Sequence, residues 1–183
     1  WPCGFNRKGL YAFAASAENF TKRLKQFAAA HKIHIAVPMA KKSSEHSGKL
    51  LNSFIFVSSQ GEILSNYQKI HLFPLTQEPS IFTNGTKPVV LELEGSKIGF
   101  ATCYDIRFPE LFRVYAENDV ELVLVAACFP DPRQHDWSTL LQARAIENQY
   151  FVLGVNAVGN DQIETQTLTY FGHSTLINPR GDQ

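Results

Sequence analysis

The order of hydrophobic and polar residues in the first part of the chain predicts a helix that leads into a strand. Residues 16–30 carry charged residues on one side and apolar residues at helical spacing on the other, with Ser16 available as the N-terminal cap. The apolar positions of this predicted helix are Phe20, Leu24, Phe27 and Ala28. Residues 33–39 then have the composition of a β-strand.

Two pairs of strands are predicted next. Residues 51–58 and 63–72 are apolar and rich in β-forming residues, and the polar residues Ser59-Gln60-Gly61-Glu62 separate them. Residues 89–93 and 97–102 flank a second turn, at Gly95. We expect a hairpin at the first turn and two neighbouring strands at the second.

Helices and strands alternate in the second half of the chain. We predict a helix from Pro109, a buried strand at residues 122–128 and a long helix capped by Asp131-Pro132. Extended stretches at residues 150–156 and 172–177 complete the pattern. Alternating helices and strands are typical of an α/β layered fold, and the hairpins indicate a mixed sheet.

Composition limits the classes of protein to consider. The 183 residues are 44% hydrophobic and 12% aromatic, enough for one sizeable core, so we predict a single domain over residues 1–183. Basic and acidic residues number 17 each, so no net charge would attract nucleic acid or an anionic membrane. The chain has neither an apolar run of about 18 residues nor a signal-peptide pattern at its start, and we expect a cytoplasmic protein. Because the chain starts at Trp1 and its only methionine is Met39, we expect a piece of a longer protein.

One of three cysteines stands where a nucleophile is expected. Cys3, Cys103 and Cys128 form no CxxC pair, and their odd number argues against a disulfide framework and a zinc site, so each is expected to be a free thiol. Cys103 follows the apolar strand 97–102 and precedes a turn into a helix, where side chains project into the crevice in which α/β proteins bind ligands. Backbone N–H groups at such a turn can face an oxyanion. The alternative is a buried cysteine that only packs, and by position alone Cys128 is as good a candidate.

A lysine is the second candidate for catalysis, because a thiol needs a neighbouring base or cation to ionise near neutral pH. Lys69 lies toward the end of an otherwise apolar strand, where a cation is unfavourable unless it has a partner or a task. One alternative is a surface lysine whose stem alone is buried. Another is a cysteine–histidine site drawing on His71, His135 or His173, although none of these lies in a recognisable protease context.

Three segments together resemble successive signatures of the nitrilase superfamily of carbon–nitrogen hydrolases, in the same order and at matching separations. The segments are Tyr67-Gln68-Lys69-Ile70-His71-Leu72-Phe73, Gly99-Phe100-Ala101-Thr102-Cys103-Tyr104-Asp105-Ile106-Arg107-Phe108-Pro109-Glu110-Leu111 and Ala143-Arg144-Ala145-Ile146-Glu147-Asn148. The segment around Cys103 is fairly specific by itself, and the three together span most of the chain. The resemblance favours a nucleophilic Cys103 over a packing cysteine.

The resemblance also implies a fold, a site and partners. The fold is an α/β, four-layer αββα sandwich, here a fragment that lacks the first strand and helix and the C-terminal tail, and members of the family pair into homodimers. Carried over by position, Cys103 is the nucleophile, while Lys69 and the backbone N–H of Tyr104 stabilise the oxyanion. An ammonium near the thiol lowers the pKa of the thiol and stabilises a charge that forms only on reaction. Glu78 matches a second glutamate near the lysine, the alternative being a loop carboxylate in water. The implied partner is a small-molecule amide, and no metal or organic cofactor is needed.

The general base of the family is a glutamate in a Pro-Glu pair, which the resemblance puts just upstream of Trp1-Pro2-Cys3-Gly4-Phe5. We therefore expect the 183 residues alone to have negligible amidase activity. The alternative function is a non-catalytic binding or assembly module with the same fold. At the other end, Asn178-Pro179-Arg180-Gly181-Asp182 matches a late hairpin of the family.

Within the superfamily, Phe129-Pro130-Asp131-Pro132-Arg133 most resembles the ω-amidases, which hydrolyse 2-oxoglutaramate or related ω-amides. Phe129 stands where close relatives often have tryptophan and would form a wall of the substrate pocket. Arg133 would bind a substrate carboxylate through a bidentate pair, with a surface arginine as the alternative. Arg107 is expected to brace the turn after Cys103. An N-carbamoyl amide hydrolase is the alternative substrate class.

Overall fold

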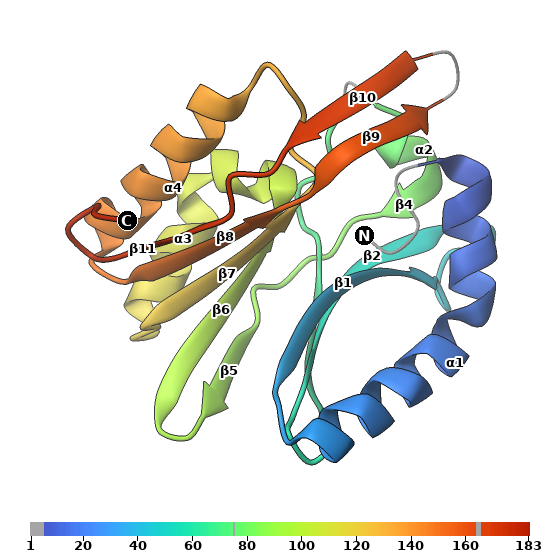
Figure 1. Ribbon diagram of the computed structural model, residues 1–183, viewed down its shortest axis with the longest axis horizontal. Helices are drawn as coiled ribbons and strands as arrows, with labels where there is room; N and C mark the ends of the chain where they lie inside the picture. The colour runs from blue at the N-terminus through green and yellow to red at the C-terminus, as the bar shows by residue number, and fades with distance from the viewer. Residues whose placement is uncertain (1–5, 75, 164–165) are drawn as a thin grey trace. The chain divides into compact units, whose positions relative to one another are not determined.

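The structure is a computed structural model that describes residues 6–74, 76–163 and 166–183, so Cys3 and the rest of Trp1–Phe5 lie outside the described residues. The chain forms two compact units, residues 1–87 and 88–183. Each unit combines helices with a β-sheet, which confirms the predicted α/β class (Figure 1). A single domain over residues 1–183 stays a prediction.

The sheet of the first unit is mainly antiparallel. Its strands are β1 (Ile35–Lys42), β2 (Leu50–Val57), β3 (Ile63–Gln68) and β4 (Phe82–Thr83). The first three lie side by side in sequence order, which confirms the hairpin between β2 and β3, and β4 pairs in parallel with the start of β2. β3 ends at Gln68, earlier than the predicted strand that reached Leu72.

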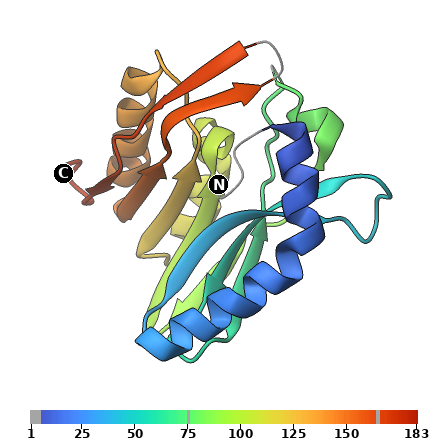
Figure 2. The same cartoon turned by 45° about the vertical axis from the view of Figure 1, so that its right-hand side comes forward.

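A helix longer than predicted covers this sheet. α1 (Arg7–His31) packs on β1 and β2, and its buried residues are Leu10, Ala14, Ala17 and Ala28 (Figure 2). The predicted cap at Ser16 is wrong, because Asn6 caps the helix by accepting hydrogen bonds from the backbone N–H groups of Lys8 and Gly9. The alanine-rich residues before Ser16 favour helix, and the Ser16 hydroxyl donates to the carbonyl of Phe13 within it.

Gly61 allows the β2–β3 turn to approach α1 closely. Its φ of +80° lies in the left-handed region, and a Cβ at this position would lie 2.6 Å from the carbonyl oxygen of Lys25. Both the conformation and the contact require glycine here.

The second unit has a five-stranded mixed sheet in the order β11-β8-β7-β6-β5. Its strands are β5 (Val90–Leu93), β6 (Ser96–Thr102), β7 (Leu122–Ala127), β8 (Phe151–Asn156) and β11 (Thr175–Ile177). β6, β7 and β8 are parallel, whereas β5 and β11 pair antiparallel at the two edges. The carboxyl ends of the three parallel strands therefore meet at one edge of the sheet, where α/β proteins bind ligands.

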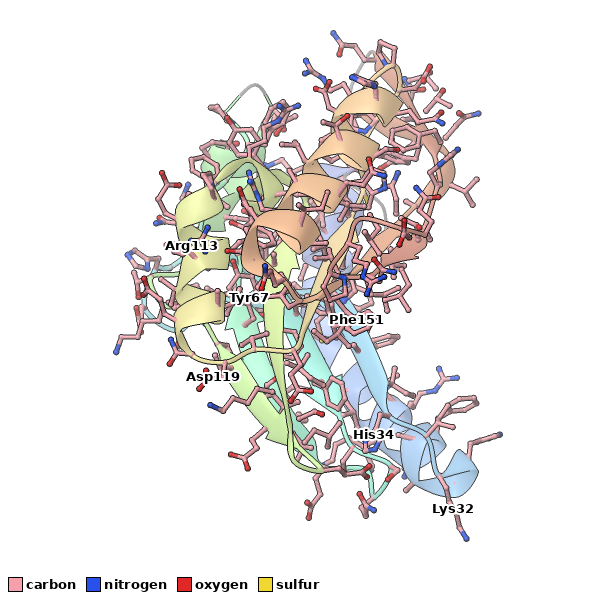
Figure 3. The ribbon with its side chains drawn as sticks, turned by 90° about the vertical axis from the view of Figure 1, so that its left-hand side faces the viewer. Lys32, His34, Tyr67, Arg113, Asp119 and Phe151 are labelled. Carbon is pink, nitrogen blue, oxygen red and sulfur yellow. The ribbon has the colours of Figure 1, made fainter. Side chains whose placement is uncertain are left out.

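Two helices, α3 (Pro109–Glu117) and α4 (Gln134–Asn148), pack on one face of this sheet. Glycines on that face admit them: a Cβ at Gly99 would lie 2.9 Å from the Tyr115 ring, and one at Gly154 would lie 2.5 Å from Leu141. Figure 3 shows Arg113 on α3 and Asp119 in the turn that follows it.

The predicted cap of α4 by Asp131-Pro132 is wrong. α4 begins at Gln134, after Arg133, and the backbone N–H of Asp131 donates instead to the carbonyl of Thr169, 2.9 Å away. This hydrogen bond ties Asp131 to a strand that the sequence pattern did not reveal.

That strand belongs to a two-stranded antiparallel ribbon, β9 (Val158–Ile163) and β10 (Gln166–Phe171). Most of its residues are exposed or only partly buried, so it lacks the apolar alternation that reveals strands in a sequence. The short helices α2 (Glu78–Ile81) and η1 (Cys103–Arg107, a 3₁₀ helix) were not predicted either. The strand expected at residues 172–177 is shorter and begins at Thr175.

Candidate active site

Lys69 and Glu78 form a buried ion pair in the first unit. The Nζ atom lies 2.8 and 2.7 Å from the two carboxylate oxygens, and both side chains are 1% exposed. The amide of Asn52 donates to Oε1 of Glu78 at 3.0 Å, and the backbone N–H of Phe73 donates to Oε2 at 2.6 Å. Glu78 is therefore not a loop carboxylate in water, and Lys69 is not a surface lysine with only its stem buried.

The main chain also holds Lys69 in place just after β3. Its N–H donates to the carbonyl of Asn52 at 2.9 Å, and its carbonyl accepts from the N–H of Gly85 at 2.7 Å. A buried ammonium is unfavourable without an opposite charge and hydrogen-bond acceptors. Glu78 supplies both, so the position of the ammonium is set at its two ends, by the backbone and by the carboxylate.

Cys103 stands at the carboxyl end of β6, as the first residue of η1. Its φ is +51°, a left-handed conformation that residues other than glycine rarely adopt. The residue is half-buried, whereas Cys128, which follows β7 at the same edge of the sheet, is 9% exposed. Tyr104 comes next and packs edge-on against Phe108, with ring centroids 5.3 Å apart. Exposure thus separates two cysteines that the sequence could not tell apart by position.

Two buried charged side chains hold the η1 turn. The carboxylate of Asp105 is fully buried and accepts a hydrogen bond from the N–H of Thr102 at 2.9 Å. From α4, Arg144 donates through Nε and Nη2 to the carbonyl oxygen of Ile106 at 3.0 and 2.9 Å, while its Nη1 lies 2.8 Å from Glu147. The second and third signature segments of the sequence therefore meet at this turn.

Arg107 braces the same turn against α4, as expected. Its Nη2 lies 2.6 Å from Oδ2 of Asp136, and its guanidinium lies over the ring of Phe129, 5.8 Å from the centroid. The hydrogen bond from Arg107 holds the pKa of Asp136 below its ordinary value, and the charge of Arg133 acts in the same direction. Arg133 itself is 48% exposed, with its Nη1 3.8 Å from the same carboxylate oxygen. Asp136 is a residue that sequence reasoning missed.

Phe129 lies in the loop after β7 and is only 3% exposed. Its ring packs on Trp137, with centroids 5.4 Å apart. The side-chain amide of Asn156, at the end of β8, accepts from the N–H of Phe129 at 2.6 Å and donates to its carbonyl at 3.2 Å. The only sequence signal for Asn156 is a polar residue at the end of an apolar strand. Its side chain pairs with the backbone of Phe129 as a neighbouring strand would, so the loop is anchored at the edge where Cys103 stands.

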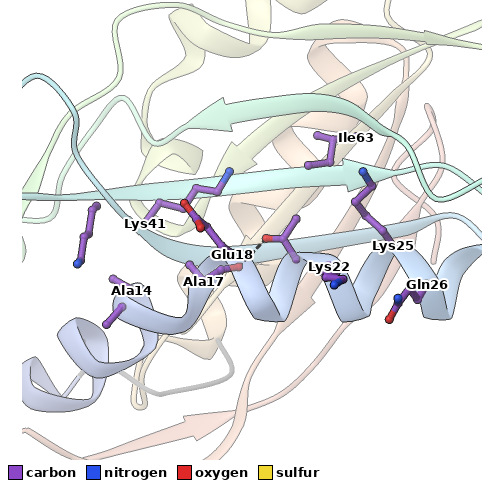
Figure 4. A pocket seen from close by; sticks show the side chains of 11 residues that line it. Ala14, Ala17, Glu18, Lys22, Lys25, Gln26, Lys41 and Ile63 are labelled. Carbon is purple, nitrogen blue, oxygen red and sulfur yellow. Dashed lines mark hydrogen bonds between the residues drawn. The ribbon is translucent and has the colours of Figure 1, made fainter.

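A groove of about 840 Å³ on the first unit is lined by α1, β1 and the start of β3 (Figure 4). Lys22, Lys25 and Lys41 lie along it, and burial lowers the pKa of Lys41. None of the predicted site residues lines this groove, so its size does not identify the site.

Within residues 6–74, 76–163 and 166–183, no cluster of three or more histidine, cysteine, aspartate or glutamate side chains is placed to hold a metal ion. Among the described helices, none is both long and apolar enough to cross a membrane.

Known proteins resemble the chain along nearly its whole length. Residues 1–182 match the family model described as carbon-nitrogen hydrolase. The 2-oxoglutaramate amidase of Bacillus subtilis (strain 168) is 34% identical over 188 residues, covering 99% of this chain and 68% of that protein. The omega-amidase YafV of Escherichia coli (strain K12) is 40% identical over 132 residues, covering 72% of this chain and 49% of that protein.

A solved structure has the same fold. A mutant of the amidase from Nesterenkonia sp. AN1, which shows Michael addition of acrylamide at its active-site cysteine, matches with a TM-score of 0.86 and 26% identity. The match covers 98% of this chain and 69% of that one. The chain spans about three fifths of the length of the curated relatives it matches.

Proposed function

Because the chain belongs to the carbon–nitrogen hydrolase family, we propose that the protein hydrolyses the carbon–nitrogen bond of a small linear amide with Cys103 as the nucleophile. The position of Cys103 carries this proposal. The residue is half-buried, stands at the ligand-binding edge of the parallel strands and opens a turn held by Asp105 and Arg144. The matching family and the amidase names of the relatives support a hydrolytic rather than a packing role.

The reaction is acyl transfer in two steps. A base takes the thiol proton, the sulfur attacks the amide carbon, and the carbonyl oxygen becomes a negatively charged alkoxide. The carbon–nitrogen bond then breaks, and the nitrogen takes up a proton and leaves as ammonia, which leaves a thioester on Cys103. Water adds to the thioester carbon in the second step, and the carboxylic acid and the free thiol are released. One amide and one water thus yield one acid and one ammonia.

We assign the oxyanion to two donors, the backbone N–H of Tyr104 and the ammonium of Lys69. Donors that are already fixed stabilise a charge that forms during the reaction without reorganising at that moment. Both carboxylate oxygens of Glu78 accept hydrogen bonds from Lys69, and each accepts one more, from the side-chain amide of Asn52 or the backbone N–H of Phe73. Glu78 is therefore proposed as the residue that pairs with the Lys69 side chain and orients it. We assign the general base to none of the residues that the structure describes.

The proposed substrate class is an ω-amide of a dicarboxylic acid, such as 2-oxoglutaramate. The names of the Bacillus subtilis and Escherichia coli relatives support it. In this proposal Phe129 forms a wall of the acyl pocket, since its ring is held by Trp137 and its backbone by Asn156. Arg133, which is half exposed, binds the far carboxylate.

Ammonia release by the intact protein tests this function. The panel contains 2-oxoglutaramate, succinamate and an N-carbamoyl amino acid. We expect Cys103→Ala to abolish release and Cys128→Ala to retain most of it. Comparable turnover by the two variants would contradict the assignment of Cys103 as the nucleophile. A preference for the N-carbamoyl compound over the two ω-amides would favour the alternative substrate class. Iodoacetamide is expected to alkylate Cys103 before Cys128, since alkylation follows thiolate fraction and exposure.

A further inference from the structure

Tyr170 is a buried tyrosine to which the proposed reaction gives no task. It lies on β10 and is 6% exposed. It forms a single β-bridge with Pro130, and the hydrogen bond from Asp131 to Thr169 lies beside that bridge. The β9–β10 ribbon continues from the end of β8 (Figure 1), and β10 contacts the loop that follows β7.

This contact brings Tyr170 to the edge of the sheet where Cys103 stands. β6 and β7 are neighbouring parallel strands with Thr102 opposite Ala126, so the turn after β6 and the loop after β7 leave the sheet side by side. Desolvation raises the pKa of Tyr170 above its ordinary value, and the charges of Cys128, Asp161 and Cys103 raise it further. The phenol is therefore held in its protonated form, as a hydrogen-bond donor.

The hydroxyl of Tyr170 differs from those of the other buried tyrosines in this unit. Tyr115 donates to the carbonyl of Phe100, and Tyr150 donates to the carbonyl of Phe112 at 3.2 Å. The Tyr170 hydroxyl has no hydrogen-bond partner among the residues that the structure describes. The fully enclosed side-chain atoms without a partner in that part of the chain belong to Asn52, Ser53, Ser65, Thr102 and Asn148. Since Tyr170 is not one of them, its side chain is buried but its hydroxyl is not fully enclosed.

We infer that the Tyr170 hydroxyl donates a hydrogen bond to the acyl part of the substrate, to a carbonyl or carboxylate oxygen other than the one at the attacked carbon, and so determines substrate specificity. The inference rests on the proposed function. The oxygen at the attacked carbon already has its proposed donors. Tyr170 instead lies beside Pro130, the residue after Phe129, and we place the acyl chain of the substrate at Phe129. A donor that faces an apolar chain loses its bond to water without a replacement, so the site favours an amide with an oxygen at that point.

Two amides of similar size test this inference in the intact protein. Succinamate carries a carboxylate where butanamide carries a methyl group. Tyr170→Phe is expected to lower kcat/KM for succinamate roughly 10- to 100-fold, mainly by raising KM, because a hydrogen bond to a charged group is lost. Hydrolysis of butanamide is expected to stay within about twofold, since that substrate never made the bond.

Tyr150→Phe is the matched control, because it removes a hydroxyl that bonds only to the backbone. It is expected to lower the melting temperature and to leave the ratio of the two kcat/KM values unchanged. An equal fall for both amides in Tyr170→Phe, or no fall for either, would overturn the inference.

A wild-type protein that hydrolyses neither amide would contradict the proposed function instead. Calorimetric binding of succinamate to Cys103→Ala, with and without Tyr170→Phe, then decides the inference separately. Weaker binding with the second substitution supports it. Equal affinity, including no binding in either case, overturns it.

Discussion

The ammonium of Lys69 lies between the two carboxylate oxygens of Glu78, at 2.8 and 2.7 Å, with both side chains withdrawn from solvent. The attraction inside such a pair is largely offset by the desolvation of two charges, so the pair itself adds little to stability. Removal of one partner is different, because it leaves the other charge buried and uncompensated. The stability lost when one partner is removed therefore measures how deeply the remaining charge is buried, more than how strongly the two charges attract each other.

Glu78→Gln is expected to lower the free energy of unfolding by about 3–5 kcal/mol, measured by urea denaturation. Asp119→Asn is the control, since it removes an exposed pair in which Oδ2 of Asp119 lies 3.4 Å from Nζ of Lys97 and the aspartate side chain is 89% exposed. That change should be within the error of the measurement. Equal losses in the two variants would show that the Lys69–Glu78 pair is not buried in solution.

The left-handed backbone of Cys103 predicts the relative stability of its glycine and alanine variants. At φ +51°, a Cβ is unfavourable and glycine is not, so Cys103→Gly is expected to be more stable than Cys103→Ala by about 1 kcal/mol. Cys128 is not among the described residues with positive φ, so there the order should reverse and Cys128→Gly should be the less stable variant. Urea denaturation of all four variants measures this. The same order at both positions would contradict the backbone assignment.

Arg144 tests whether the η1 turn depends on a bidentate contact. Lysine keeps the charge but lacks the planar fork with which Arg144 reaches the carbonyl of Ile106 twice. Arg144→Lys is expected to lower the free energy of unfolding by about 1.5–3 kcal/mol. Arg113→Lys, at an exposed residue whose Nη2 lies 3.4 Å from the carbonyl of Glu147, should change it little. Indistinguishable urea midpoints for the two variants would argue against a structural role for the fork.

The Arg107–Asp136 pair predicts a pH dependence of stability. Because the folded-state pKa of Asp136 lies below its ordinary value, its contribution is present above the pKa of the unfolded chain and is lost as the pH falls through the lower folded-state pKa. The carboxylate is 38% exposed, so screening by water makes the effect small. The stability difference between wild type and Asp136→Asn should thus be largest near neutral pH and should vanish in acid.

Urea denaturation at several pH values measures this difference. In an Arg107→Gln background the pH-dependent part of the difference should shrink, because the hydrogen bond that lowers the pKa of Asp136 most is gone while the charge of Arg133 remains. A difference that grows as the pH falls would contradict the assigned sign.

The elements that were predicted correctly share a physical property. The strands β2, β6, β7 and β8 carry apolar residues on at least one buried face. A buried strand therefore has a recognisable pattern of apolar residues in the sequence. The β9–β10 ribbon buries little, so it left no such pattern and was missed together with Tyr170. The start of α1 was predicted too late in the chain, because the alanine-rich residues before Ser16 favour helix as strongly as those after it.

The local order of residues was enough to predict which segments form the candidate site: a cysteine after a buried strand, a lysine in an apolar stretch, and three signatures in a fixed order. It did not indicate which side chains hold these segments in place. Glu78 reaches Lys69 from a separate short helix, and Arg144 reaches the turn after Cys103 from 38 residues beyond Ile106. Such contacts depend on how strands and helices pack, and the local pattern of residues encodes each element without encoding its neighbours. For the same reason, Cys103 and Cys128 look alike in the sequence and differ in exposure once the chain is folded.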